Sequence, residues 1–240
     1  MPLAPTGTAV VKQTAGAAVT VVDTLLSTVA GELVIVWNAT VRGTNVPDNL
    51  ITDDKGNTWS QLGFKFQDPV SVSISWAIIA SGKDGNLAIT LRGNGTNSYD
   101  MGFRAERWTG GPASSPVSGT AVTAGAATGT QADTGAFTPA DANALYVSMC
   151  CFSSGSNITH NQAPGDTNWT DPGQLNSALL AGPLYYILSG AAVARRAASS
   201  TDGSSNPWAT MLGAFKPAAA GGGPTVQAVP TMRTPNIFIT

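Results

Sequence analysis

The strongest constraint on the fold is a strict two-residue alternation in residues 70–78, VSVSISWAI. Large apolar residues at the even positions from Val70 to Ile78 alternate with serine or alanine. Successive side chains of a strand point to opposite faces, so this pattern predicts a β-strand with one buried face. The alternation returns at Leu87, Ile89 and Leu91 after a short link containing Asp and Gly, which predicts an antiparallel hairpin.

Other segments carry the same strand signal. The sequence ELVIVWNATV is apolar on both faces, which predicts a central strand covered on both sides. Short β-rich runs elsewhere bring the total to roughly eight to ten strands. No segment keeps a 3.6-residue period for three turns, and residues 24–30 come nearest. We therefore expect an all-β, antiparallel β-sandwich of two sheets, in a jelly-roll or immunoglobulin-like arrangement.

The chain divides into one large domain and a tail. We assign residues 1–217 to the sandwich, residues 218–223 (AAAGGG) to a flexible hinge and residues 224–240 to an extended C-terminal arm. Residues 110–138 hold few large apolar side chains, and we interpret them as exposed edge strands and long loops.

Charge and hydropathy argue against several classes of partner. Only 11% of residues are charged and the formal net charge is −2, so no basic surface for nucleic acid is expected. No run of eighteen apolar residues suggests a membrane span, and the N-terminus does not resemble a signal peptide. We expect synthesis in a cytoplasm, where the adjacent Cys150 and Cys151 stay free thiols.

Catalytic and metal-binding residues are scarce. His160 is the single histidine and lies in a loop of turn formers, and the two glutamates are Glu32 and Glu106. We interpret Glu32 as a solvated charge at a strand end, and Glu106 as the partner of Arg104 in a strand-surface ion pair. The stretch TDDKGN, which includes Asp53 and Asp54, resembles a calcium loop but lacks its downstream Glu, so a plain turn is favoured. The prediction is a non-enzymatic protein without metal or cofactor.

Three aromatic residues in or beside polar loops are candidates for stacking on a sugar: Tyr99, Trp169 and Trp208. Tryptophans of β-sandwiches are more often buried anchors, and aromatic residues make up only 7% of this chain. Packing in the core or in an interface is therefore the favoured interpretation.

Three segments together resemble a known module: ITDDKGNTWSQLG, VSISWAIIASGKDGNLAITLRG, and the stretch from FRAERWTGG to TGAFTPADANALYVSM. Their order resembles a jelly-roll, concanavalin-like β-sandwich module of bacteriophage virion proteins, which occurs in capsid decoration and tail-associated proteins. The resemblance covers roughly residues 30–217 and implies a fold without transferable catalytic residues.

The resemblance implies a structural role in a virion. The expected function is that of a capsid decoration or cement protein, with the major capsid protein, other virion proteins and further copies of itself, such as a trimer, as partners. The alternative is a receptor- or carbohydrate-binding module of a tail fibre or adhesin, in which residues 153–173 contact host sugars.

The C-terminal arm is expected to form an interface with a neighbouring subunit. Its prolines at 224, 230 and 235 exclude a helix and favour an extended course. The terminal NIFIT is suited to adding a strand to an exposed sheet edge. The alternative is that this segment is the last strand of its own sandwich. The expected interface residues are Val226, Val229, Met232, Ile237, Phe238 and Ile239.

Overall fold

The computed structural model describes residues 3–18, 20–41, 50–92, 99–153, 158–159, 169–173, 175, 180–187, 191–201 and 205–219. These residues form fifteen strands and no helix. Every pairing between the strands is antiparallel. The predicted all-β, antiparallel class is confirmed, with more strands than the sequence indicated.

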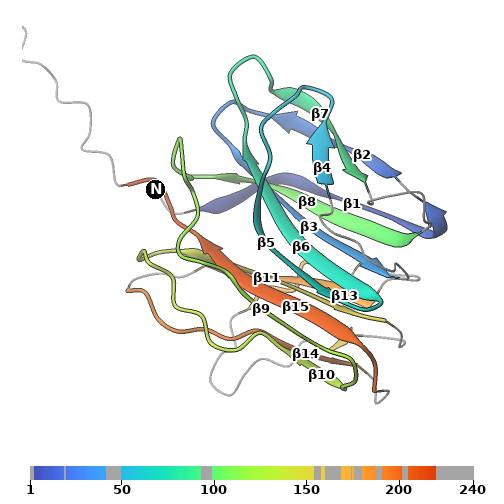
Figure 1. The fold of residues 1–240 in the computed structure, drawn as a ribbon. Coiled ribbons are helices and arrows are strands. Elements are labelled where there is room, and N and C mark those ends of the chain that lie inside the picture. The colour runs from blue at the N-terminus through green and yellow to red at the C-terminus, as the bar shows by residue number, and fades with distance from the viewer. Residues whose placement is uncertain are drawn as a thin grey trace, which may run out of the picture.

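The strands form four sheets, which Figure 1 shows as successive layers. Sheet I has the order β2-β7-β4, with bounds Thr20–Thr28, Gly85–Arg92 and Leu50–Asp53. Sheet II has the order β1-β8-β3-β6-β5, with bounds Ala4–Ala18, Tyr99–Thr109, Leu33–Val41, Val70–Ile78 and Ser60–Gln67. Sheet III has the order β13-β11-β15-β9, with bounds Leu180–Ile187, Leu145–Phe152, Trp208–Phe215 and Val122–Ala126. Sheet IV has the order β10-β14-β12, with bounds Gln131–Asp133, Ala198–Thr201 and Ile158–Thr159.

The main core lies between sheets II and III. Alternate residues of β3, Ile35 and Trp37 among them, meet Val147 and Met149 of β11 and Met211 of β15, and all five are fully buried. A β-strand presents alternate residues to each face, so the intervening positions of these strands face outward to sheets I and IV. The predicted sandwich thus corresponds to sheets II and III.

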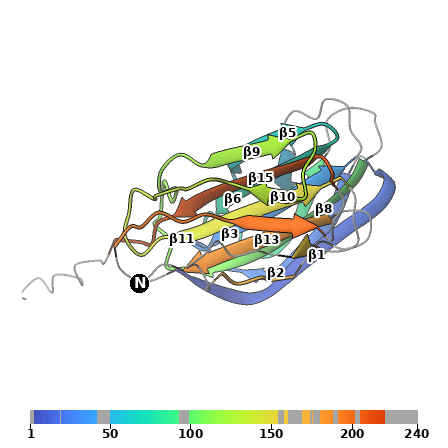
Figure 2. The ribbon, with the colours of Figure 1, turned by 90° about the horizontal axis from the view of Figure 1, so that it is seen from below.

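A further layer covers each face of this sandwich. Sheet I packs on sheet II through a second core that includes Val34 of β3, Phe103 of β8 and Ile89 of β7. Sheet IV lies over sheet III, where Phe152 and Ile158 share a smaller cluster. Figure 2 gives the same layers from below. The expectation of only two sheets is therefore wrong, although the sandwich itself is confirmed.

Two-sided burial explains the most apolar strands. All nine residues of β3 are buried, and so are all eight of β11 and of β15. The prediction that ELVIVWNATV is a central strand covered on both sides is confirmed. Cys150 and Cys151 of β11 are free and buried, and they join cores on opposite sides of sheet III.

The predicted hairpin between residues 70–78 and 87–91 is wrong. Strand β6 pairs with β3 and β5, whereas β7 pairs with β2 and β4. The chain therefore passes from sheet II to sheet I at this point. Ile79 is buried in the core between those sheets, and Gly82 in the connection and Gly85 at the start of β7 take positive φ. Alternation identifies both strands, but it does not specify which strands pair.

The serine face of β6 is also covered, contrary to the expected strand with one buried face. Ser71 and Ser73 are fully buried. Ser73 Oγ donates to Asn38 Oδ1 at 2.9 Å, and the hydroxyls of Ser71 and Thr40 lie 2.6 Å apart. These bonds let β3 and β6 bury polar side chains, since a buried hydroxyl is tolerated when it has a partner.

The segment from 110 to 138 is placed as expected. It contributes β9 at one end of sheet III and β10 at one end of sheet IV, with long connections around them. Few large apolar side chains are needed at these positions, because an edge strand buries less of its surface than a central one.

Candidate functional site

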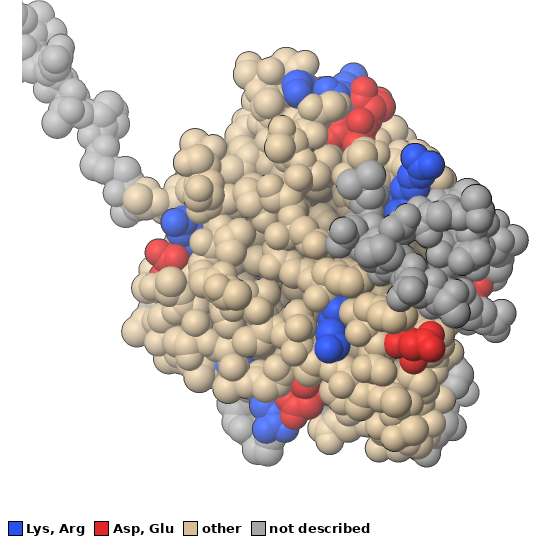
Figure 3. All heavy atoms as spheres, viewed as in Figure 1, with Lys and Arg blue, Asp and Glu red and all other residues tan. Residues whose placement is uncertain are grey.

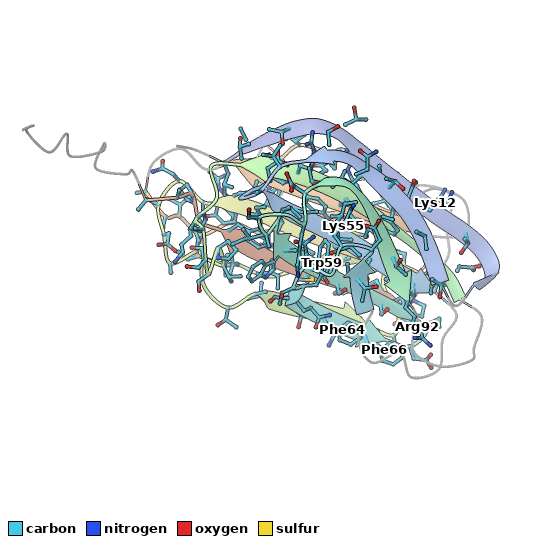
Figure 4. All side chains as sticks on the ribbon, turned by 90° about the horizontal axis from the view of Figure 1, so that it is seen from above. Lys12, Lys55, Trp59, Phe64, Phe66 and Arg92 are labelled. Atoms are coloured by element: carbon cyan, nitrogen blue, oxygen red, sulfur yellow. The ribbon has the colours of Figure 1, made fainter. Side chains whose placement is uncertain are left out.

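The TDDKGN stretch forms a turn that is organised around one carboxylate. Asp53 is the last residue of β4, and its Oδ1 accepts from the backbone N–H groups of Lys55 at 2.8 Å and Asn57 at 3.2 Å. Its Oδ2 accepts from the indole N–H of Trp59 at 2.6 Å. Asn57 Oδ1 in turn accepts from the backbone N–H of Ala80, in the connection between β6 and β7. Figure 4 labels Lys55 and Trp59, two residues of this turn region, in a view from above.

This arrangement supports the interpretation of the stretch as a plain turn. Both carboxylate oxygens of Asp53 accept hydrogen bonds from N–H donors of the same turn, as an Asp that stabilises a turn does. Asp54 Oδ1 accepts from the backbone N–H of Ala88 at 2.9 Å. Within the described ranges, no three His, Cys, Asp or Glu side chains are grouped so that they could hold a metal ion.

Both glutamates of the chain form ion pairs near β1. Glu106 Oε1 lies 2.6 Å from Nε of Arg104 on the same face of β8, as predicted, although the pair is more buried than a surface pair. Glu32 is 7% exposed and accepts from the backbone N–H of Val29 at 2.8 Å and from Thr6 Oγ1 at 3.0 Å. Arg107 Nη1 lies 3.4 Å from its Oε2. The prediction of a solvated charge at Glu32 is wrong, because this carboxylate joins β1, the β2–β3 turn and β8.

A bulge in β1 opens a small cavity beside these ion pairs. Thr6 pairs with Arg107 and Val10 pairs with Ala105, so residues 7–9 of β1 lie opposite Glu106 alone. Gly7 takes a φ of +67° there. The resulting cavity has a volume of about 200 Å³ and is lined by Pro5, Thr6, Gly7, Ala9, Arg104, Glu106 and Arg107. Bulges of this kind redirect side chains next to binding sites as well as at sheet edges.

The polar atoms at the bulge are not all paired. Glu106 Oε2 and Arg107 Nε are buried and have no hydrogen-bond partner among the described residues. Arg104 and Glu106 share one face of β8, and Arg107 points to the other. Each glutamate is bound by its own arginine, so the two carboxylates do not face one another as a pair of acids flanking one bond would.

The aromatic candidates lie in the interior where the structure describes them. Trp169 is 7% exposed, and its ring lies 6.3 Å from that of Tyr146, edge to face. Trp208, the first residue of β15, is 9% exposed and shares a cluster with Phe152. Neither indole offers an open face for a sugar, which supports the favoured interpretation of core packing. The side chain of Tyr99 and residue His160 lie outside the described residues, as does most of the loop from 153 to 173.

The C-terminal end of the sandwich is fixed beside β1. After β15, the backbone N–H of Lys216 donates to Pro116 O at 2.7 Å, and that of Ala218 donates to Gly110 O at 2.6 Å. Gly110 follows Thr109, which pairs with Ala4 at the start of β1. The chain therefore leaves the sandwich next to the start of β1 (Figure 1). The six predicted interface residues of the arm lie outside the described residues.

Charged side chains are few on the face shown in Figure 3, where they stand singly or in small groups. In the part of the chain that is described, no helix is long and apolar enough to cross a membrane. Comparisons of the chain with protein-family models, with curated proteins and with solved structures found no match.

Proposed function

We propose that this chain is a non-enzymatic structural protein of a phage particle, a capsid decoration protein that binds the shell and neighbouring subunits through residues 224–240. One observation carries the proposal: the last described strand of the four-layered domain ends at Phe215, and a backbone hydrogen bond from Ala218 to Gly110 fixes the chain just after it. Six apolar side chains and three prolines follow in the arm. A segment of this composition gains most by burying its apolar side chains on another surface.

Two further features support a structural role. The acidic side chains that were candidates for catalysis or metal binding in the sequence, Asp53, Glu32 and Glu106, each accept hydrogen bonds or form ion pairs with the protein itself. The order of three segments, ITDDKGNTWSQLG, VSISWAIIASGKDGNLAITLRG and the stretch from FRAERWTGG to TGAFTPADANALYVSM, resembles the module of phage virion proteins. A particle component needs a stable body and a means of joining neighbours, and the domain and the arm would supply one each.

Deletion of residues 224–240 tests this proposal. The truncated protein should remain folded, with a cooperative melt near that of the full chain, and should no longer join particles or oligomers. A matched full-length variant with Ile237, Phe238 and Ile239 replaced by serine should behave in the same way, because it removes apolar area without shortening the chain. An insoluble truncation, or one that assembles normally, would contradict the proposal.

The second candidate is a receptor- or carbohydrate-binding module, and the cavity at the β1 bulge favours it. A sugar hydroxyl both donates and accepts, so it can bind a carboxylate and an arginine of the cavity lining at once. Titration with glucose, galactose and N-acetylglucosamine, followed by NMR, should then shift the signals of Thr6 and Gly7, and Glu106→Gln should weaken the effect. Copy number separates the two candidates, since a decoration protein is present in hundreds of copies per particle and a fibre tip in a few.

A further inference from the structure

Strand β1 forms one end of sheet II, and no other described strand pairs with its outer edge. Within the described residues it pairs on one side only, with β8. Figure 4 places Lys12 of β1 at the outer rim of the layers. An edge strand presents unpaired N–H and C=O groups and is a template for an added strand.

Two irregularities limit the usable part of this edge. Register shifts occur between Thr6 and Val10 and between Thr14 and Ala18. Between them, residues 10–14 pair without interruption with residues 101–105 of β8. The regular edge is therefore five residues long. Val11, near its centre, is 41% exposed, so an apolar side chain already lies open on this edge.

The last five residues of the arm match this edge. Residues 236–240, NIFIT, follow Pro235 and contain no proline, so each of them has an N–H group to donate. Isoleucine, phenylalanine and threonine all favour strands. In an extended strand Ile237 and Ile239 share one face and can flank Val11.

We propose that residues 236–240 of one subunit add as a strand to residues 10–14 of β1 in a second copy of the chain. This inference rests on the proposed function and names the surface that receives the arm. Addition of a strand joins main-chain groups along the edge, while the pockets beside it select the side chains.

The arm is long enough to reach a second copy of the chain. Residues 219–235 number 17 (235 − 219 + 1), and fully extended they span about 56 Å at 3.3 Å per residue. The subunit's own edge segment begins only six residues along β1 from Ala4, about 20 Å away. A tether of this length reaches either edge, and a second copy is favoured because the arm is proposed to join neighbouring subunits; cysteine cross-linking separates the two cases.

Cysteine cross-linking tests the contact directly. Val11→Cys is combined with Ile237→Cys, Phe238→Cys or Ile239→Cys in turn, and the oxidised protein is separated on a denaturing gel without reductant. At least one pair should give reducible dimers and larger species. Val22→Cys is the matched control, because Val22 of β2 is 46% exposed and lies on sheet I. The native Cys150 and Cys151 are buried and should not interfere.

A second pair of variants tests the same edge without cross-linking. Val11→Glu should abolish oligomers, measured by light scattering, and leave the melt unchanged, whereas Val22→Glu should leave both unchanged. A link confined to single chains, no link at any pair, or normal oligomers in Val11→Glu would overturn this inference. If deletion of 224–240 still abolishes assembly in those cases, the arm docks elsewhere and the proposed function stands.

Discussion

Replacement of Asp53 by Asn would disturb the turn after β4 with minimal change in size. The carboxylate accepts at both oxygens, from the backbone at Oδ1 and from Trp59 at Oδ2. An amide keeps one acceptor oxygen and places an NH₂ group at the other position. In one rotamer the NH₂ faces the indole N–H of Trp59, and in the other it faces the backbone N–H groups of Lys55 and Asn57. Either way, donors face donors.

The expected loss in the free energy of unfolding depends on the hydrogen bonds that Asp53→Asn removes and on how deeply they are buried. A hydrogen bond to a charged group contributes about 1.5–3 kcal/mol, and a buried donor left without a partner costs about 1–3 kcal/mol. Asp53 and Trp59 are half-buried, so water relieves part of the loss. We expect the free energy of unfolding to fall by about 2 kcal/mol, which lowers the Tm of a domain of this size by about 4–8 °C.

Thermal and urea unfolding at pH 7, followed by circular dichroism, would measure this loss. Asp54→Asn is the matched control, because it removes the same charge from the next residue while its amide oxygen can still accept from Ala88. That variant should stay within about 0.5 kcal/mol of the parent. Equal stability of the two variants would refute the role given to Asp53.

Three other outcomes are expected. EDTA should leave the Tm unchanged, because within the described residues no three His, Cys, Asp or Glu side chains are grouped so that they could hold a metal ion; a fall restored by calcium would contradict this. Ile74→Ala should lower the free energy of unfolding in urea by about 2–5 kcal/mol, and Ser73→Asp should also destabilise the protein, since both residues are fully buried. A stable Ser73→Asp variant would show that the serine face of β6 is open to solvent. Burial raises the pKa of Cys150 from its ordinary 9.0 to about 11 and also raises that of Cys151, so both thiols should resist a thiol reagent at pH 8 until the protein unfolds. The unfolded chain loses these protons first, so the thiols' contribution to stability should be complete below about pH 9 and decline as the pH rises toward 11; rapid native-state labelling would contradict the burial.

The strands were predictable where each residue's own chemistry decides its position. The apolar faces of ELVIVWNATV predicted two-sided burial, and β3 shows it. The serines of β6 led to the wrong prediction of a solvent-exposed face, since small polar residues are typical of such a face. The serines can be buried because Asn38 and Thr40 of β3 form hydrogen bonds with them. These partners lie more than thirty positions away in the sequence, so the residues around each serine do not indicate them.

The partners of each strand and the bulge at Gly7 could not be predicted from the alternation of apolar and polar residues alone. β6 and β7 both alternate, yet they join different sheets because Ile79 enters the core between them. Glu32 follows a glycine and precedes a strand, and nothing local indicates that Thr6 and Arg107 approach it. Gly7 within a strand pattern was the available signal, because glycine at such positions often marks a bulge.

The pairing of β1 with β8 has a consequence for synthesis on the ribosome. Ala4 finds its partner only when Thr109 has been made, and sheet III lacks a central strand until Phe215. At roughly 5–20 residues per second, the interval between these two events is about 5–20 s. Residues 224–240 are translated after this last central strand. The order of translation therefore delays the arm until every described strand of the domain has been made, and if the arm joins subunits as proposed, incomplete chains would lack the means to enter an assembly.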